Sequence, residues 1–280
     1  MSKIILYETD KLFTGKVLKR PSKNIKSPYV ADVLINDEEE ALAHSPSLGC
    51  CGLADINANV LLTENKNKNT KTKNKIEFSI FEENHNNQYN KQIIGINPKI
   101  AEKVGYNAIM KNCIKSLQNV KEIKTEQVFE NSRFDIWGKD ENDTEFILEI
   151  KTVPLADYVD MTKKDRLKNI DYINTRNVDQ KISYFPDGYR KNKNDPVSPR
   201  ALKHIQELEK IKLERNIRCI LLFVVQRIDV EVFQTSNLDS IYKDAVKKAY
   251  DNGVEVEVIQ INWNIEGIGY FHSNNLNISL

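Results

Sequence analysis

The feature that most constrains the fold is the segment 217–225, which is apolar at every position except Arg218. A strand with one face in water alternates apolar and polar residues, whereas a continuous apolar run of this length is typical of a strand buried on both faces. Segments with apolar residues at helical spacing lie on either side of it, at 200–215 and 240–252. Strands that alternate with helices in this way predict an α/β layer fold.

We expect two domains, 1–97 and 98–280, because the two halves of the chain have different patterns. The first half has short β runs separated by turns, as in a small antiparallel barrel. These runs are 4–6, 14–18, 29–35, 59–63, 76–81 and 92–96. The second half predicts helices at about 98–117, with Gly105 as a candidate break, and at 200–215 and 240–252; its strands are 125–129, 133–137, 146–153, 218–225, 230–234 and 255–261.

Composition excludes several classes of protein. The four cysteines lack the paired spacing of a zinc site, and no segment has the pattern of a signal peptide or a membrane span, so we expect a soluble intracellular protein with no membrane partner. The 41 basic residues nearly balance the 40 acidic ones. Any nucleic-acid binding must therefore come from local patches. The candidate patches are 66–75, 163–168 and 190–193, although a solvated loop is the simpler explanation of each.

Two neighbouring β runs carry residues suited to phosphodiester hydrolysis. Asp135 lies in the first run, and Glu149 and Lys151 lie in the second. Residues two apart on a strand point to the same face, so Glu149 and Lys151 are expected to lie together while the carbonyl of Ile150 can join a metal site. Carboxylates suit Mg²⁺ or Mn²⁺, and a lysine can stabilise the charge that develops at phosphorus. Glu126, on a different segment, is a candidate second carboxylate or general base.

This pattern alone is common, and an equally simple reading is a pair of edge strands with solvent-facing charges. A wider set of residues makes the nuclease-type reading the stronger one, because in collinear order they resemble the sugar fermentation stimulation protein family. The matching segments are 44–49, 60–62, 132–135, 149–155, 184–187, 200–208, 222–227 and 249–256. The resemblance covers most of the chain and is much more specific than a Glu-x-Lys tripeptide.

The resemblance implies an OB-type barrel followed by a restriction-endonuclease-like α/β/α domain of the PD-(D/E)xK class, with a central mixed sheet. It also implies that Asp135, Glu149 and Lys151 form the metal and catalytic core, with Glu126 as a helper. The residues expected to border the cleft and contact nucleic acid are Arg133, Arg200, Lys203, His204, Gln226 and Arg227. For His204, an ordinary position on the helix surface is an equal alternative.

The chain departs from the family pattern at several points. Ser47 replaces an expected asparagine and Ala201 an expected glycine, and the segments 65–75, 156–183 and 190–199 are enlarged. None of these changes removes a proposed ligand.

Three functions are consistent with the sequence. The first is a Mg²⁺- or Mn²⁺-dependent nuclease that acts on DNA. The second is a DNA-binding regulator that keeps the nuclease scaffold without catalysis, and the third is a protein unrelated to nucleic acid, which the balanced charge supports. A homodimer is compatible with each of these three functions.

Overall fold

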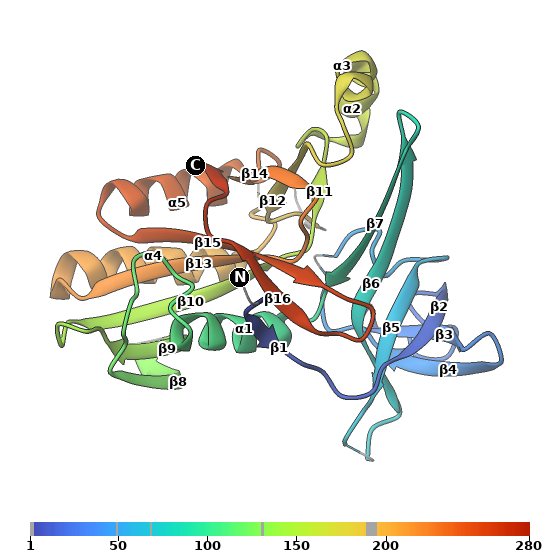
Figure 1. Cartoon of the computed structure of the whole chain (residues 1–280), viewed down its shortest axis with the longest axis horizontal. Helices are drawn as coiled ribbons and strands as arrows, with labels where there is room; N and C mark the ends of the chain where they lie inside the picture. Colours follow the sequence, from blue (N-terminus) through green and yellow to red (C-terminus); the bar gives the residue numbers. More distant parts are fainter. Residues whose placement is uncertain (1–2, 49, 68, 130–131, 189–194) are drawn as a thin grey trace.

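A computed structural model describes residues 3–48, 50–67, 69–129, 132–188 and 195–280. The chain forms a six-stranded barrel, a seven-stranded sheet and a small four-stranded sheet, with helices on the seven-stranded sheet (Figure 1). The barrel is formed by β2 (Phe13–Lys19), β3 (Val30–Ile35), β4 (Glu39–His44), β5 (Asn59–Glu64), β6 (Asn74–His85) and β7 (Gln88–Gly95).

The barrel is antiparallel in the order β4-β3-β2-β5-β6-β7, and a short parallel pairing of β4 with β6 closes the ring. Its interior is filled by buried aliphatic side chains that alternate with outward-facing residues, as a half-buried strand requires. They include Val17, Val33, Val60, Leu62 and Ile94. The expectation of an OB-like barrel in the first half of the chain is confirmed.

The seven-stranded sheet forms the centre of the second half. In spatial order its strands are β1 (Ile5–Tyr7), β16 (Gly269–Ser273), β15 (Glu255–Trp263), β13 (Arg218–Val225), β10 (Glu145–Val153), β9 (Ser132–Lys139) and β8 (Glu122–Phe129). The three central strands β10, β13 and β15 are parallel and the outer pairings are antiparallel, so the sheet is mixed.

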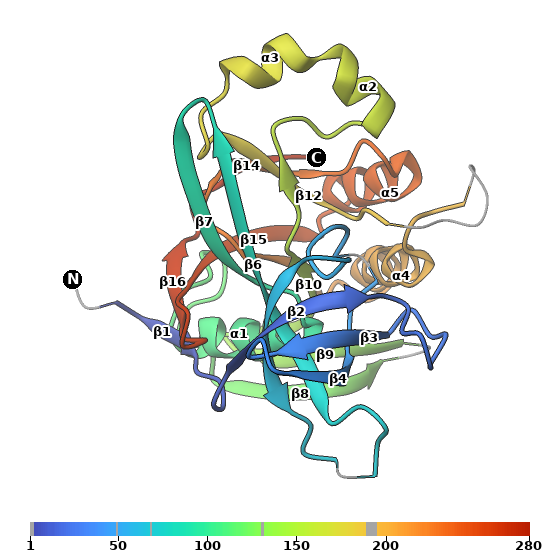
Figure 2. The same ribbon diagram turned by 90° about the vertical axis from the view of Figure 1, so that its right-hand side faces the viewer.

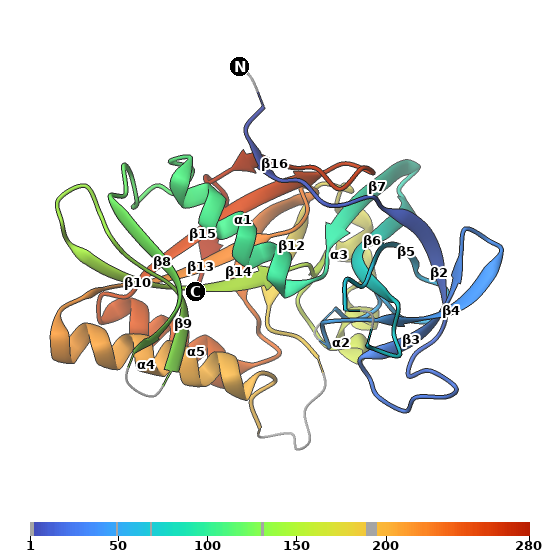
Figure 3. The same ribbon diagram turned by 90° about the horizontal axis from the view of Figure 1, so that it is seen from below.

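Helices cover both faces of this sheet, with α1 (Pro98–Met110) on one side and α4 (Pro199–Arg215) and α5 (Ser240–Asp251) on the other (Figure 3). Alternate residues of β13 belong to the two cores: Leu222 packs on the α1 side and Leu221 on the α4 side. The strand is therefore buried on both faces, as its continuous apolar run predicts, and the α/β/α arrangement is confirmed.

Some elements differ from the sequence-based expectation. Helix α1 continues through Gly105 without a break. The glycine is explained by close packing, because a side chain at this position would meet the buried Ile150. Strand β1 pairs with β16, so residues 5–7 belong to the large sheet and not to the barrel. The described residues contain no helix long and apolar enough to cross a membrane.

The enlarged segment after β10 forms structure of its own. It contains β11 (Ala156–Asp157), α2 (Lys163–Lys168) and α3 (Ile170–Thr175), and it leads into β12 (Lys181–Phe185), which pairs with β14 (Val230–Thr235); β17 (Asn277–Ser279) completes the small sheet. The two short helices lie over the tip of the β6–β7 hairpin (Figure 2). There the Asn86 side chain donates hydrogen bonds to the carbonyls of Asn174 and Arg176.

A candidate metal and catalytic centre

Strands β9 and β10 bring two carboxylates together where their pairing ends. The ladder between the strands runs as far as Leu148 opposite Ile136. Beyond that point the backbone N–H of Ile150 donates to Asp135 Oδ2 at 2.7 Å. The Asp135 carboxylate thus accepts a hydrogen bond from the next strand and is held beside Glu149.

Glu149 is almost fully buried, and its two oxygens have different surroundings. Its Oε1 accepts from Lys151 Nζ at 2.5 Å and is hydrogen-bonded to Nδ1 of His204. Its Oε2 is buried without a hydrogen-bond partner among the described residues. A buried charged oxygen without a partner is costly, so it marks a position where a cation or a donor from a ligand would be stabilised.

The pKa values of the two carboxyls move in opposite directions. Burial, and then the charge of Glu149, raise the pKa of Asp135 to about 7. Burial also acts to raise the pKa of Glu149, but the charge of Lys151 and the hydrogen bond with His204 outweigh it and the pKa is lowered. Two neighbouring carboxyls with separated pKa values are typical of catalytic sites and of sites that bind cations.

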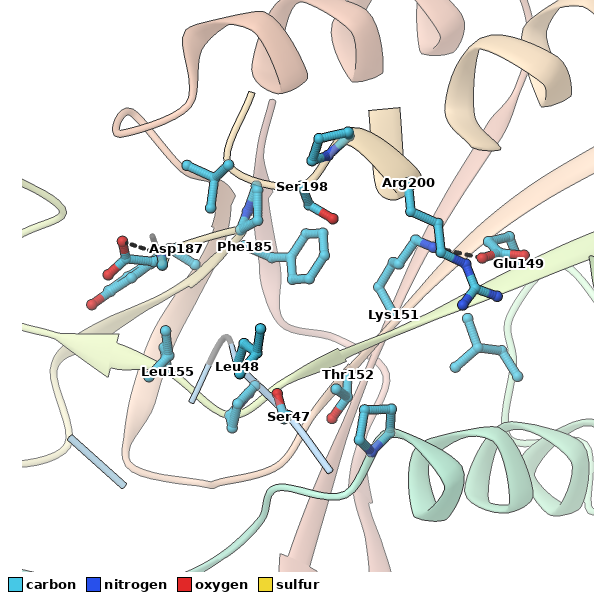
Figure 4. Close-up of a pocket in the computed structure, with 18 of the residues that line it drawn as sticks. Ser47, Leu48, Glu149, Lys151, Thr152, Leu155, Phe185, Asp187, Ser198 and Arg200 are labelled. Carbon is cyan, nitrogen blue, oxygen red and sulfur yellow. Dashed lines mark hydrogen bonds and ion pairs between the residues drawn. The ribbon is translucent and has the colours of Figure 1, made fainter. Parts of the chain in front are cut away.

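The carboxylates line one end of a cavity of about 500 Å³. Lys151, Thr152 and Arg200 lie near them, while Leu155, Phe185 and Asp187 lie toward the other end (Figure 4). Ser47 and Leu48, from the loop after β4 of the barrel, contribute to the wall. The site therefore lies between the barrel and the seven-stranded sheet.

Glu126 lies in a second cavity, of about 310 Å³, that shares Asp135 and Arg200 with the first. Its carboxylate forms ion pairs with Lys99 at 3.0 Å and with Arg133 at 2.8 Å. The bond from Lys99 is the main cause of a lowered pKa for Glu126. Glu126 thus lines a cavity together with Asp135 and is held by two basic residues.

The remaining predicted residues of helix α4 have different surroundings. Arg200 is exposed and lines both cavities. Lys203 is also exposed, and it pairs with Glu207 at 3.6 Å. His204, which the sequence places equally well at the cleft or on the helix surface, is 5% exposed and lies behind Glu149, with its ring against Phe134.

Gln226 and Arg227 do not border the cavity, contrary to the sequence-based expectation. Gln226 is fully buried: its side chain donates to Thr152 Oγ1 at 3.1 Å and accepts from Trp263 Nε1 at 2.9 Å. Arg227 is 2% exposed, pairs with Asp229 at 2.6 Å and lies over the ring of Phe81. Both follow the end of β13, and the barrel hairpin that packs there covers them.

One carboxylate near the site carries no sequence signal that separates it from the other glutamates. Glu102 of α1 lines both cavities, pairs with Lys99 at 2.7 Å and contributes to the raised pKa of Asp135. Its position depends on how α1 packs on the sheet, which a pattern of residues along one segment does not specify.

The predicted basic patches differ in their surroundings. In 66–75, Lys66 pairs with Asp10 at 2.7 Å and Lys75 with Glu77 at 3.3 Å. In 163–168, which forms α2, Lys168 pairs with Asp165 and Arg166 with Asp157. The patch 190–193 lies outside the described residues.

The donor set at the carboxylate pair fits a hard divalent cation. Asp135 and Glu149 supply oxygens, and the partnerless Oε2 of Glu149 provides a position for positive charge. Within the described ranges, no three His, Cys, Asp or Glu side chains are grouped to hold a metal by themselves. A site here would therefore combine the two carboxylates with water and backbone carbonyl oxygen, as Mg²⁺ sites do.

The fold and this site define a protein in which a closed barrel is joined to an α/β/α layer structure, with an acidic centre between them. The family model described as "Sugar fermentation stimulation protein RE domain" matches residues 99–164 and 157–267. The chain belongs to the sugar fermentation stimulation protein family.

Relatives of this chain and one solved structure match it over most of their length. It is similar to the sugar fermentation stimulation protein homolog of Bartonella henselae, at 27% identity over 92% of this chain and 93% of the relative. The homolog of Clostridium novyi is 28% identical over 88% of each chain. The solved structure of Pyrococcus furiosus SfsA in complex with Ca²⁺ matches with a TM-score of 0.74 and 20% identity, covering 99% of this chain and all of that one.

Proposed function

We propose that this protein is a divalent-metal-dependent nuclease that hydrolyses phosphodiester bonds in DNA. The observation that carries the proposal is the convergence of Asp135, Glu149 and Lys151 at one end of a cavity, with Glu149 Oε2 buried and without a partner. A nuclease needs anionic oxygens to hold a cation and a positive side chain beside the reacting phosphate. That the solved relative is described as a complex with Ca²⁺ supports a divalent cation in this family.

The residues have separate roles in this proposal. Asp135, Glu149 and the backbone carbonyl of Ile150 would hold Mg²⁺ or Mn²⁺, which when bound supplies an activated water and polarises a phosphoryl oxygen. Lys151 stabilises the negative charge that develops at phosphorus. His204 orients Glu149 through their hydrogen bond. Arg133 and Arg200 bind neighbouring phosphates, while Glu126 holds Arg133 in place through their ion pair.

The experiment is a cleavage assay with end-labelled single-stranded, duplex and branched DNA in Mg²⁺, in Mn²⁺ and in a chelator. We expect cleavage that requires the metal, and a loss of at least 100-fold in Asp135→Asn and Lys151→Met, because removing one group that stabilises charge in the transition state has about this effect. Glu266→Gln, an exposed acid on a turn, is the matched control.

The same assay separates the nuclease from a binding protein. A protein that binds DNA without cutting it would shift labelled DNA on a gel in chelator, with an affinity that falls as salt rises. If no substrate is cut with either metal while such a shift persists in Glu149→Gln, the nuclease proposal is wrong and the binding alternative stands.

A further inference from the structure

We propose that the cavity at the carboxylate pair holds one unpaired nucleotide, with its base at the apolar end and its phosphate at the carboxylate end. The inference rests on the proposed function, since it specifies the substrate class for the same site. It implies a preference for single strands, strand ends or unpaired positions over intact duplex.

The two ends of the cavity have different chemistry. Glu149, Lys151 and Arg200 lie together at one end. Leu155, Phe185 and Leu48 gather away from them, with Asp187 as the one labelled charged side chain on that side (Figure 4). Tyr29 and Tyr184 also line the cavity. A nucleotide has the same division, because its phosphate is anionic while its base has two apolar faces that stack on aromatic and aliphatic side chains.

The size of the cavity favours one nucleotide. About 500 Å³ lies within the range of roughly 300–1,000 Å³ found for small-molecule pockets. A base pair held in a stacked duplex cannot enter such a space, because the helix around it is wider than the cavity. Enzymes that act inside a pocket of this kind receive single strands or nucleotides turned out of the stack.

Walls on several sides restrict access further. The loop carrying Ser47 and Leu48 comes from the barrel, and Val197 and Ser198 precede helix α4 on the other side. The cavity is therefore formed between segments of both domains. A duplex lying across the surface would contact the rim, whereas a single strand can enter.

Basic side chains continue from the carboxylate end, where Glu126 and Glu102 hold them in ion pairs. Arg200 lines both this cavity and the adjoining one, in which Arg133 and Lys99 also lie. Successive phosphates of a strand leaving the carboxylates toward this second cavity would meet these side chains. The apolar end receives one base while this basic side follows the backbone.

The experiment compares the affinity of the protein for three labelled probes in Ca²⁺: a strand of ten thymidylates, a strand of ten abasic units with the same phosphates, and a blunt duplex. We expect the thymidylate strand to bind about tenfold more tightly than the abasic strand, since stacking of one base has about this effect. The duplex should bind more weakly than the thymidylate strand.

Leu48→Asp tests the apolar end itself. Leu48 is 48% exposed, so the change should leave folding intact, and it should reduce the difference between the thymidylate and abasic strands to less than twofold. Phe185→Leu is a second variant that keeps an apolar side chain, with a smaller loss expected. Tyr250→Ala removes an exposed aromatic side chain on α5 and is the control that should keep the full difference.

Cleavage in Mn²⁺, measured in parallel, separates this inference from the proposed function. Cleavage with equal affinity for all three probes, or a difference that Leu48→Asp leaves unchanged, overturns the unpaired-nucleotide inference alone. Binding that depends on the base and is lost in Leu48→Asp, without cleavage of any substrate, supports the inference and overturns the nuclease proposal.

Discussion

At the scale of residues, the candidate site depends on a pair of carboxyls that the fold holds close together, and this arrangement lowers the stability of the protein. Asp135 is half-buried beside the charged Glu149, and its pKa of about 7 reflects burial first and that charge second. When folding raises the pKa of a carboxyl, the free energy of unfolding falls as pH rises from the pKa of the unfolded state, about 4, to the pKa of the folded state. Such local instability is common where a site is built for function.

Asp135→Asn should therefore stabilise the protein in the absence of metal. The amide oxygen can still accept from the Ile150 N–H, while the repulsion from Glu149 disappears. We expect the free energy of unfolding at pH 8 in chelator to rise by about 1–3 kcal/mol. Urea denaturation measures it, with Glu266→Gln as the control. A lower free energy of unfolding for Asp135→Asn would show that repulsion between the two carboxyls does not destabilise the protein.

At the scale of elements, the start of helix α1 joins the barrel to the sheet that carries the site. Asn97 is the N-cap of α1, and its Oδ1 accepts from the backbone N–H of Lys99 at 3.1 Å. Its Nδ2 donates to Glu77 Oε2 of strand β6 at 2.5 Å. Both residues are buried, so one amide satisfies a helix end and a buried carboxylate together.

Asn97→Ala should destabilise the protein by about 2–4 kcal/mol. Loss of a cap costs about 1 kcal/mol, and leaving a buried oxygen with fewer hydrogen bonds costs about 1–3 kcal/mol more. The comparison is Thr162→Ala, which removes the cap of the short helix α2 with no buried carboxylate involved. Equal losses of unfolding free energy in urea for the two variants would contradict the proposed role of Glu77.

The elements that could be predicted from sequence are those with a regular pattern of their own. The apolar run of β13 and the helical spacing of α4 each agree with the structure. The polar strand β4, the short strand β16, the edge strand β17 and the short helices α2 and α3 were missed, because packing on distant segments stabilises them and local pattern does not. Gly105 suggested a break in α1, yet its lack of a side chain serves close packing against Ile150.

At the scale of the whole molecule, buried charges link the barrel hairpin to β12 and to the segment that follows β13. Lys181 of β12 pairs with Glu83 of β6 at 2.5 Å and with Asp229 at 2.9 Å. Arg227 also pairs with Asp229, and Asn90 of β7 donates to the same carboxylate at 2.7 Å. This network explains why Arg227 lies away from the cavity. It connects Lys181 to Glu83 and Asp229 to Asn90, pairs that lie far apart in the sequence. Spacing along the chain therefore did not reveal it.

The network predicts a pH-dependent stability. Burial acts to raise the pKa of Asp229, but Arg227 and Lys181 outweigh it and lower the pKa to about 2. A lowered pKa contributes stability above the unfolded value of about 4, and this contribution is lost as pH falls toward 2. Asp229→Asn should therefore cost at least about 2 kcal/mol at pH 7.

Urea denaturation between pH 7 and pH 3 measures this difference in unfolding free energy between the protein and Asp229→Asn. It should stay constant down to about pH 4 and shrink below that value. Asp244→Asn, an exposed acid on α5, is the control and should show no such trend. A difference that grows as pH falls would contradict the ion pairing.

The candidate site was predictable only in part. Asp135, Glu149 and Lys151 were found because two neighbouring strands carry them at spacings that chemistry explains. The burial of His204 and the proximity of Glu102 depend on how α4 and α1 pack on the sheet, and the apolar end of the cavity requires the barrel loop. Those features are produced by tertiary structure, which brings segments of the barrel and of the seven-stranded sheet together.

The central claim is that Asp135 and Glu149 hold a divalent cation, and calorimetric titration with Mn²⁺ at pH 8 tests it most directly. We predict saturable binding by the unmodified protein, at least a tenfold weaker affinity in Asp135→Asn and Glu149→Gln, and unchanged binding in Glu266→Gln. Equal Mn²⁺ affinity in the protein and in both carboxylate variants would contradict the claim.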